Sequence, residues 1–428
     1  MKEKLSPYIQ YMYSYPHKTA YRTFATPIYI GDYTDIPGKE HASLYFHIPF
    51  CRYKCGYCNL FSIAGCSTDG MDAYLKAMEK QVEQLAPMFS DWQFSSFAIG
   101  GGTPLLLTSG QMERLWKMAG WLGVDPLQTP VAIETSPEFA SLESLLTLKE
   151  RGVQRISIGI QSFREQELKQ LRRFSSPATV RKALETIREV DFPSFNVDLI
   201  YGMEGQTVES FTDSIRQALS YQPTGLFVYP LYVRPEMVAV KRVPDEECMR
   251  FYRIAVQLLR EAGYKQTSMR RFIRKESVEM EFSCGDEVML ACGAGGRSYL
   301  GDLHTATPYA VRTQEIRSVL RQYADTVDHR FIRHGYLLSE EKKRRRFMIK
   351  NLMYYKGLDR HEYEERFGTF PELPVLGMLR ERGWIKTQAS VFYLTEEGLA
   401  WSDYIGQLFI SPAVREAMEA YSFNRTAR

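Results

Sequence analysis

Cys51-Arg52-Tyr53-Lys54-Cys55-Gly56-Tyr57-Cys58 is the stretch that decides the fold, because it places three cysteines within eight residues. The mostly apolar run Leu44–Ile48 precedes it, so we expect a loop that leaves a β-strand. Such a loop can wrap around a cube-shaped iron–sulfur cluster. Three thiolates then bind three irons, and the fourth iron has no protein ligand.

A structural zinc ion is the competing interpretation of the same cysteines. Structural zinc needs four ligands, usually from paired knuckles. Cys66 or His47 could be offered as the fourth ligand, but neither lies at knuckle spacing. The spacing therefore favours an iron–sulfur cluster bound by Cys51, Cys55 and Cys58.

Composition limits the class of protein around this motif. The chain has 428 residues, 44% of them hydrophobic, and a formal net charge of +3, which suits a soluble globular protein of two or three domains. Its apolar runs are too short for a membrane span, and its first residues do not resemble a secretory signal. We therefore expect a cytoplasmic protein without a disulfide framework, without a membrane or nucleic-acid partner, and monomeric.

Between residues 43 and 262, apolar strands alternate with amphipathic helices. The expected strands are Leu44–Ile48, Ser96–Gly100, Val131–Glu134, Arg155–Ile160, Asn196–Tyr201 and Gly225–Tyr229. The expected helices are Met71–Ala86, Gln111–Met118, Ser141–Arg151, Pro177–Val190 and Val208–Tyr221. This alternation predicts an α/β fold with a parallel sheet covered by helices. Six units favour a partial (β/α)6 barrel, with an open doubly wound sheet as the alternative.

The rest of the chain is organised differently. We expect an N-terminal arm over 1–42, a barrel over 43–262, a barrel extension or linker over 263–330, and a helical domain over 331–428. The C-terminal domain should contain helices Glu341–Tyr354, Arg360–Phe367 and Leu373–Arg382, a hairpin at 384–394, and a helix Thr395–Gln407. This order resembles a winged helix, but without a basic cluster at the turn before the hairpin we expect a structural or capping role.

Several residues at the expected strand ends have chemistry suited to a bound ligand. Gly100, Gly101 and Gly102 would let the backbone approach a ligand at the mouth of the barrel. Glu134 could accept hydrogen bonds from an ammonium or a ribose. Asp198 lies in an apolar strand, where a charge without a partner is costly.

Two further polar residues follow the fourth expected strand. Gln161 offers both a donor and an acceptor, and Arg173 could bind a carboxylate through two hydrogen bonds.

These motifs together resemble a known family. The sequences Tyr45–Cys51, Cys51–Cys58, Gly100–Pro104, Glu134, Gly159–Phe163, Arg173 and Asn196–Gly202 are similar to those of radical S-adenosylmethionine (SAM) enzymes of the oxygen-independent coproporphyrinogen III oxidase-like branch. The resemblance implies a partial barrel, a four-iron four-sulfur (4Fe-4S) cluster, SAM, a small-molecule substrate, and an electron donor of the flavodoxin or ferredoxin type.

The resemblance also implies two SAM sites. Around the first SAM it places Tyr45, Tyr57, Gly101 and Glu134. Around a second SAM it places Gly102, Thr103, Gln161, Arg173 and Asp198.

Two features differ from the family and bear on the substrate. Leu60 stands where a further cysteine is common in the oxidases. The N-terminal segment Tyr13–Arg22 also differs in sequence from the family. These differences favour radical C-methylation or related C–C bond formation on an unidentified substrate. The alternatives are oxidative decarboxylation of coproporphyrinogen III in haem biosynthesis, or a haem chaperone with His47 or His17 as iron ligand.

Overall fold

The computed structural model describes residues 5–9, 11–12, 14–233, 240–275 and 288–426, with no side chains described after residue 421. The described chain falls into two compact units. The cluster unit comprises Tyr21–Asp198 and Met280–Leu337, and the terminal unit comprises Met1–Ala20, Leu199–Glu279 and Leu338–Arg428. This division into two units differs from the four segments expected from the sequence, and the bounds of those four domains stay a prediction.

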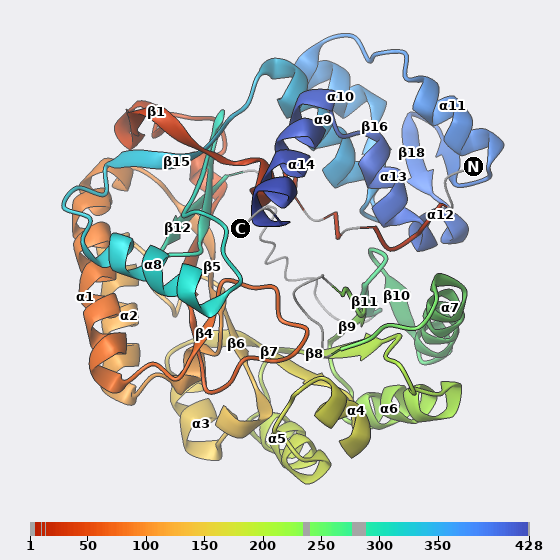
Figure 1. The fold of residues 1–428 in the computed structure, drawn as a ribbon, viewed down its shortest axis with the longest axis horizontal. Coiled ribbons are helices and arrows are strands. Elements are labelled where there is room, and N and C mark those ends of the chain that lie inside the picture. The colour runs from red at the N-terminus through yellow and green to blue at the C-terminus, as the bar shows by residue number, and fades with distance from the viewer. Residues whose placement is uncertain (1–4, 10, 13, 234–239, 276–287, 427–428) are drawn as a thin grey trace. The chain divides into compact units, whose positions relative to one another are not determined.

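Consecutive strand–helix units build the cluster unit, as the sequence predicts. Its strands are β2 (Ala42–Ile48), β5 (Phe94–Gly101), β6 (Val131–Thr135), β7 (Val153–Gln161) and β8 (Ser194–Tyr201), which begins in this unit. Its helices here are α1 (Thr68–Leu85), α2 (Ser109–Trp121), α3 (Leu142–Glu150), α4 (Glu165–Gln170) and α5 (Pro177–Val190), and the larger ones lie outside the strands in Figure 1. The strands follow one another in chain order, and β2, β5, β6 and β7 pair in parallel. A doubly wound sheet would reverse its order at a switch point, so the barrel prediction is confirmed.

Local sequence explains why these units form. Ser67, Thr108, Ser141 and Ser176 cap the starts of α1, α2, α3 and α5, and each side chain accepts a hydrogen bond from a backbone N–H in the first turn. Alternate residues of β2, such as Leu44, Phe46 and Ile48, are fully buried. The other face of each strand is therefore left for the site.

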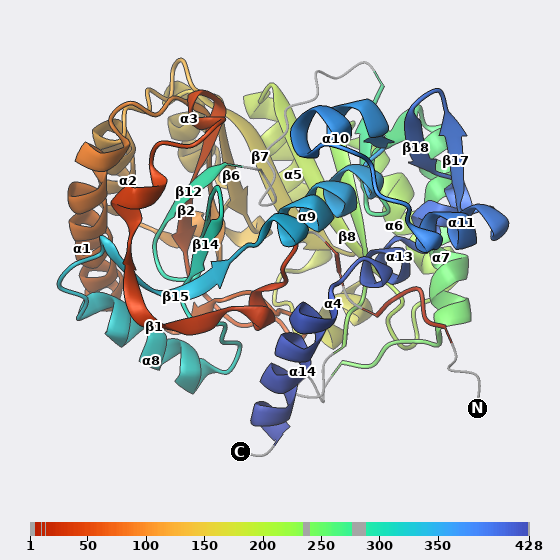
Figure 2. The same ribbon diagram turned by 90° about the horizontal axis from the view of Figure 1, so that it is seen from above.

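A second set of strands continues the sheet beyond β2, and the sequence analysis did not predict them. They are β12 (Met289–Cys292), β13 (Arg297–Leu300), β14 (Leu303–Ala306), β15 (Phe331–Leu337) and β1 (Arg22–Tyr29), seen together in Figure 2. Strand β12 pairs in parallel with β2. The pairs that follow, from β12 through β13, β14 and β15 to β1, are all antiparallel. Helix α8 (Thr313–Ala324) follows β14.

In the terminal unit, β9 (Gly225–Pro230) is the sixth predicted strand. It pairs antiparallel with β11 (Arg271–Arg274), which in turn pairs with β10 (Tyr264–Gln266). Helices α6 (Val208–Ser220), which was predicted, and α7 (Asp245–Glu261) flank β9 in the sequence. The segment Arg271–Arg274, which contains two arginines, is therefore a strand of this small sheet.

The C-terminal part of the terminal unit has the predicted order of elements. Helices α9 (Glu340–Leu352), α10 (Arg360–Phe367) and α11 (Pro374–Glu381) precede the hairpin of β17 (Ile385–Gln388) and β18 (Val391–Leu394). A short strand β16 (Leu358–Asp359) completes a three-stranded sheet, as in a winged helix. The single helix expected over 395–407 is wrong: the chain forms α12 (Glu396–Ala400) and α13 (Ser402–Leu408), which part at Trp401, and then α14 (Pro412–Thr426). The Trp401 ring stacks on the Trp384 ring, with ring centroids 5.1 Å apart, and this contact holds the chain at the break between the helices.

The N-terminal arm packs within its own unit. Tyr15 is buried, and its hydroxyl lies 3.1 Å from the Ser411 hydroxyl. Arg346 on α9 is also buried and donates to the Tyr15 carbonyl at 3.2 Å. Tyr15 and Arg346 are therefore part of the packing of this unit. Within the described residues, no helix combines the length and apolarity needed to cross a membrane.

Candidate active site

Cys51, Cys55 and Cys58 lie on a loop that the surrounding backbone holds in place. Cys51 ends the short strand β3 (Phe50–Cys51), which pairs with β4 (Ile63–Ala64). The Gly56 amide donates to the Leu171 carbonyl at 2.9 Å and ties the loop to the segment after α4. All three cysteines are free thiols and half-buried, so their sulfurs are available as ligands.

Each of these sulfurs has a polar side chain beside it. Thr103 Oγ1 lies 3.8 Å from Cys51 Sγ, and Arg173 Nη1 lies 3.6 Å from Cys55 Sγ. Ser62 Oγ lies 3.6 Å from Cys58 Sγ. Hydroxyl and guanidinium donors stabilise a thiolate more than a thiol, so these contacts suit sulfurs that have lost their protons to metal.

Burial opposes this ionisation while no metal is bound. Burial and the neighbouring Cys58 raise the pKa of Cys51 to about 11, and burial raises the pKa of Cys55. Metal coordination deprotonates such thiols. The buried Nε of Arg173 has no hydrogen-bond partner in the described part of the chain, so a bound group could use it. The residues present therefore fit an iron–sulfur cluster.

A fourth zinc ligand is missing at this loop. The ring of His47 is engaged: Nδ1 lies 3.2 Å from the Tyr45 hydroxyl and Nε2 lies 2.8 Å from the Phe61 carbonyl. Cys66 packs next to Gly70 at the start of α1. Among the described residues, no three His, Cys, Asp or Glu side chains are grouped to hold a single metal ion. Ligands that bind separate irons of a cluster do not need to converge on one point.

The three glycines at the end of β5, Gly100 to Gly102, bring the chain close to other protein atoms. A Cβ on Gly100 would lie 2.6 Å from Glu134 Oε2, and one on Gly102 would lie 2.4 Å from the Phe50 carbonyl oxygen. Gly101 has φ of 114° and faces the His47 ring, so only glycine suits this position. Its amide donates to Glu134 Oε2 at 2.9 Å. The turn therefore positions the carboxylate of Glu134.

The glycine-rich segment after β12 also encloses His47. A Cβ on Gly293 would lie 2.6 Å from the His47 carbonyl oxygen, and one on Gly295 would lie 2.6 Å from His47 Nε2. The Gly293 amide donates to Gln81 Oε1 at 2.8 Å. These glycines therefore serve close packing around His47, both of whose ring nitrogens have a polar partner.

Glu134 and Asp198 place two carboxyls on one face of the sheet. Glu134 keeps an exposed side chain, yet desolvation by the surrounding protein raises the pKa of its carboxyl. The surrounding protein atoms disfavour the charged form of this carboxyl. Desolvation and then the charge of Glu134 raise the pKa of Asp198 to about 7, against the opposing effect of Arg155.

The raised pKa of Asp198 gives a testable dependence of stability on pH. Between pH ~4, where an unfolded Asp titrates, and the folded value, the native chain binds more protons, so this residue costs stability as pH rises. We expect Asp198→Asn to become more stable than the wild type as pH increases from 5 to 8, measured by urea unfolding. Glu150→Gln, an exposed change on α3, is the control and should give no such trend. Parallel curves for Asp198→Asn and the wild type would contradict the shifted pKa.

The other predicted site residues take up different positions. Tyr57 lies beside Cys55. Burial is the main cause that raises the pKa of the Tyr57 hydroxyl, and the nearby Cys55 thiol is the second. Gln161 ends β7 with φ of 69°, and its side chain turns back toward Gly159. Arg173 donates through Nη2 to the Gly159 carbonyl as well as through Nη1 to Cys55. Thr103 and Arg173, assigned by resemblance to a second SAM, thus contact cluster cysteines here.

Two residues of this face, Arg155 and Ser157, escaped the sequence analysis, whereas Asn196 belongs to a motif that it quoted. Arg155 and Ser157 precede Gly159 and Gln161 on alternate positions of β7, and Asn196 Nδ2 lies 3.5 Å from Ser157 Oγ. The signal was present, because Arg155-Ile156-Ser157-Ile158 alternates polar with apolar residues.

Comparisons with known proteins agree with this site. A model of the radical SAM superfamily matches residues 45–218. Heme chaperone HemW of Bacillus subtilis is 28% identical over 375 residues, which cover 83% of this chain and 96% of that protein. Oxygen-independent coproporphyrinogen III oxidase of Escherichia coli is 27% identical, with 91% of each chain covered.

A solved structure shows the same fold. Coproporphyrinogen III oxidase (HemN) from Escherichia coli, described as a radical SAM enzyme, matches with a TM-score of 0.82 at 24% identity, over 93% of this chain and 96% of that one.

Residues 45–218 are therefore a radical SAM domain, of the class that uses a 4Fe-4S cluster and SAM. Over most of its length the chain is similar to coproporphyrinogen III oxidase-like proteins, which confirms the predicted resemblance.

Proposed function

We propose that this protein is a radical SAM enzyme that acts on a tetrapyrrole. The observation that carries the proposal is the set of three free cysteines, each with a polar side chain at its sulfur, within a radical SAM domain. The substrate class rests on the relatives, since the names of both an oxidase and a chaperone refer to tetrapyrroles.

The chain's own residues bind and orient the reactants. Cys51, Cys55 and Cys58 would hold the cluster, which when bound would supply the electron for the reductive cleavage of SAM. Glu134 accepts a hydrogen bond from Gly101, and its remaining lone pairs can accept from the ammonium of SAM.

We assign Tyr45 and Tyr57, with Gly101 and Glu134, to this first SAM. For a second SAM, Gln161 and Asp198 are the stronger candidates, because Thr103 and Arg173 contact cluster sulfurs. A positively charged sulfonium near Asp198 would favour its ionised form, although the isolated carboxyl has a raised pKa. Gly102 has no side chain, so it could contact the second SAM only through its backbone.

The outcome of the reaction depends on the substrate. Neither relative is described as a methyltransferase, so C-methylation has no support from the comparisons. Leu60, which stands where a further cysteine is common in the oxidases, supports a tetrapyrrole other than coproporphyrinogen. The engaged ring of His47 supports an enzyme over a haem carrier that uses this residue. The expected electron donor is a small carrier of the flavodoxin or ferredoxin type.

One anaerobic assay tests the proposal. With SAM and a reductant, haem should raise 5'-deoxyadenosine well above the uncoupled background, while coproporphyrinogen III should leave it at background with no vinyl product. The reason is geometric, since a reacting carbon misplaced by ~1 Å can cost ~100-fold in rate. Mass spectrometry of the tetrapyrrole separates the outcomes: a gained methyl group indicates methylation, and lost carbon dioxide indicates decarboxylation.

Three results would overturn parts of this proposal. Rapid formation of protoporphyrinogen would restore the oxidase assignment. Tight haem binding without 5'-deoxyadenosine would favour a chaperone. Stimulation by neither tetrapyrrole would remove this substrate class.

A further inference from the structure

Lys54 lies in the middle of the cluster loop, by which we mean residues 51–62, and its side chain is half-buried. Its ammonium donates to the Ser62 carbonyl at 2.8 Å and to the Val311 carbonyl at 2.9 Å. A fixed lysine side chain loses more conformational entropy than most others, because it has four rotatable bonds. The two hydrogen bonds offset this loss and hold the cation in one place.

The first of these hydrogen bonds leads to a cluster cysteine. Ser62 is buried, and its hydroxyl lies 3.6 Å from Cys58 Sγ. The next residue, Ile63, begins β4, and its amide donates to the Pro49 carbonyl at 2.7 Å. Lys54 therefore fixes the turn that runs from Cys58 to β4, together with the hydroxyl beside the Cys58 sulfur.

The second hydrogen bond leads to a distant part of the cluster unit. Val311 belongs to residues 307–311, which connect β14 with α8 and lie outside the radical SAM domain. The Tyr309 hydroxyl of this segment donates to the Asn59 carbonyl at 3.2 Å. Helix α8, which follows the segment, contacts β4, which follows the loop (Figure 1). Two hydrogen bonds, from Lys54 and from Tyr309, thus join residues 307–311 to the cluster loop.

The charge of Lys54 acts on all three cysteines of the site. Burial lowers the pKa of Lys54, whereas Cys58, Cys51 and Cys55 act in the opposite direction, because negative thiolates favour its charged form. The same attraction applies to a bound cluster. One electron from a reductant makes the cluster with its thiolates more negative by one unit, so a neighbouring cation stabilises the reduced form more than the oxidised form.

We propose that Lys54 is a positioning residue with two linked roles: it clamps the cluster loop to residues 307–311, and its fixed positive charge raises the reduction potential of the cluster. The inference rests on the part of the proposed function that assigns a cluster to the three cysteines, and it does not depend on the substrate. Lys54 acts through backbone carbonyls and charge, and is not itself a ligand of iron.

The clamp can be tested on the full-length protein before a cluster is added. In hydrogen–deuterium exchange, Lys54→Met should make the backbone amides of residues 58–64 exchange about 10-fold faster, because hydrogen bonds from a charged group are lost. Lys54→Arg keeps the charge and the donors, so its exchange should stay close to that of the wild type. Tyr309→Phe removes the other hydrogen bond to residues 307–311 and should also speed exchange in residues 58–64.

Lys80→Met is the matched control. Lys80 is also half-buried, and its ammonium donates to a backbone carbonyl, that of Thr326, at 3.0 Å. Its loss should leave exchange in residues 58–64 unchanged.

A redox titration of the reconstituted protein, followed by electron paramagnetic resonance, tests the charge. The midpoint potential of Lys54→Met should be more negative than that of the wild type, and Lys54→Arg should restore it. Lys54→Gln should shift the potential in the same direction as Lys54→Met, since its amide can still donate to a carbonyl but has no charge. Lys54→Gln therefore tests the charge even if Lys54→Met loses its iron. Tyr309→Phe loosens the same loop without a change of charge, so its midpoint potential should equal that of the wild type, as should that of Lys80→Met.

Each role can be overturned separately. Wild-type exchange rates in Lys54→Met would overturn the clamp. A wild-type midpoint potential in Lys54→Gln, or an equal shift in Tyr309→Phe, would overturn the role of the charge. Failure of the proposed function would look different, because the wild type itself would then hold no iron–sulfur cluster, whatever the exchange rates of its loop.

Discussion

Replacing Cys55 with alanine should leave the protein without its iron–sulfur cluster and without measurable SAM cleavage. Two remaining thiolates cannot hold three irons, and Arg173 would lose the sulfur it contacts. After anaerobic reconstitution, the wild type should contain about four irons per chain, as expected for a 4Fe-4S cluster. Cys51→Ala and Cys58→Ala should behave like Cys55→Ala in iron content, visible absorbance and 5'-deoxyadenosine formation.

The remaining cysteines supply the controls for this experiment. Cys66→Ala, Cys248→Ala and Cys292→Ala should retain the cluster, because the cysteines they replace lie outside the loop. The same is expected of Cys284→Ala, which falls outside the described residues. One zinc per chain without iron absorbance would contradict the cluster assignment.

Glu134→Ala should reduce SAM cleavage about 10- to 100-fold in the absence of substrate. Removal of a hydrogen bond to a charged group costs about 1.5–3 kcal/mol, and we assign this carboxylate to the ammonium of the first SAM. Asp198→Ala should leave uncoupled cleavage within about threefold of the wild type but abolish product formation from the substrate, because we assign Asp198 to the second SAM. Single-turnover formation of 5'-deoxyadenosine measures the first effect.

Iron content must be equal in both variants for this comparison to hold. Glu150→Gln serves again as a control for the loss of an acidic side chain. Equal losses of uncoupled cleavage in Glu134→Ala and Asp198→Ala would indicate a single SAM site.

The sequence predicted the part of the fold that depends on local patterns. The six strand–helix units are marked by apolar strands and by helix caps such as Ser67 and Ser176, which act within a few residues. The strands β12 to β15 and β1 were missed, because most are four residues long and β1 pairs with β15 more than 300 positions later in the chain. Non-local pairing of this kind leaves little trace in a local pattern.

The site was predicted to a similar extent. Crowded cysteines and a carboxylate at a strand end can be recognised from their chemistry alone, as Cys51 and Glu134 show. The contacts of Thr103 and Arg173 with sulfur depend on how loops meet in space, so spacing could not reveal them. Arg155 was missed because the strand was read for its apolar residues and not for its polar face.

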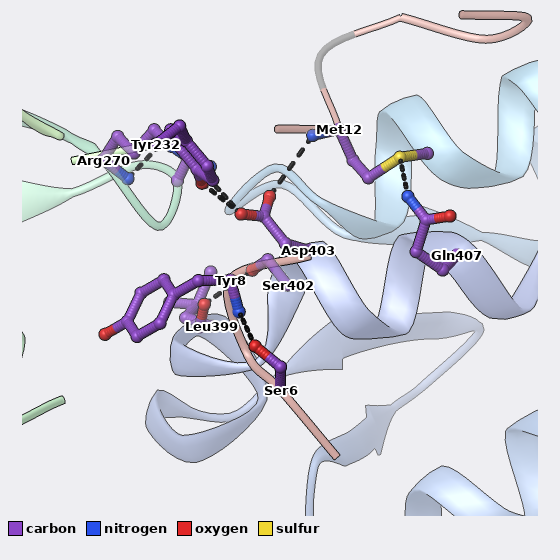
Figure 3. A network of polar contacts seen from close by, with 10 residues as sticks. Ser6, Tyr8, Met12, Tyr232, Arg270, Leu399, Ser402, Asp403 and Gln407 are labelled. Carbon is purple, nitrogen blue, oxygen red and sulfur yellow. Dashed lines mark hydrogen bonds and ion pairs between the residues drawn. The ribbon is translucent and has the colours of Figure 1, made fainter. Parts of the chain in front are cut away.

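The hydrogen bond between Met12 and Asp403 has a consequence for how the chain matures in the cell. These residues are 391 positions apart, so at roughly 5–20 residues per second the ribosome needs about 20–80 s to make the second partner after the first. During this interval Tyr8 and Met12, which are buried in the finished protein, have no folded surface on which to pack. The ion pair between Arg270 and Asp403 likewise cannot form until the C-terminal helices have been synthesised (Figure 3). The terminal unit therefore completes its folding only at the end of synthesis, and its early segments are the ones that a chaperone would have to protect.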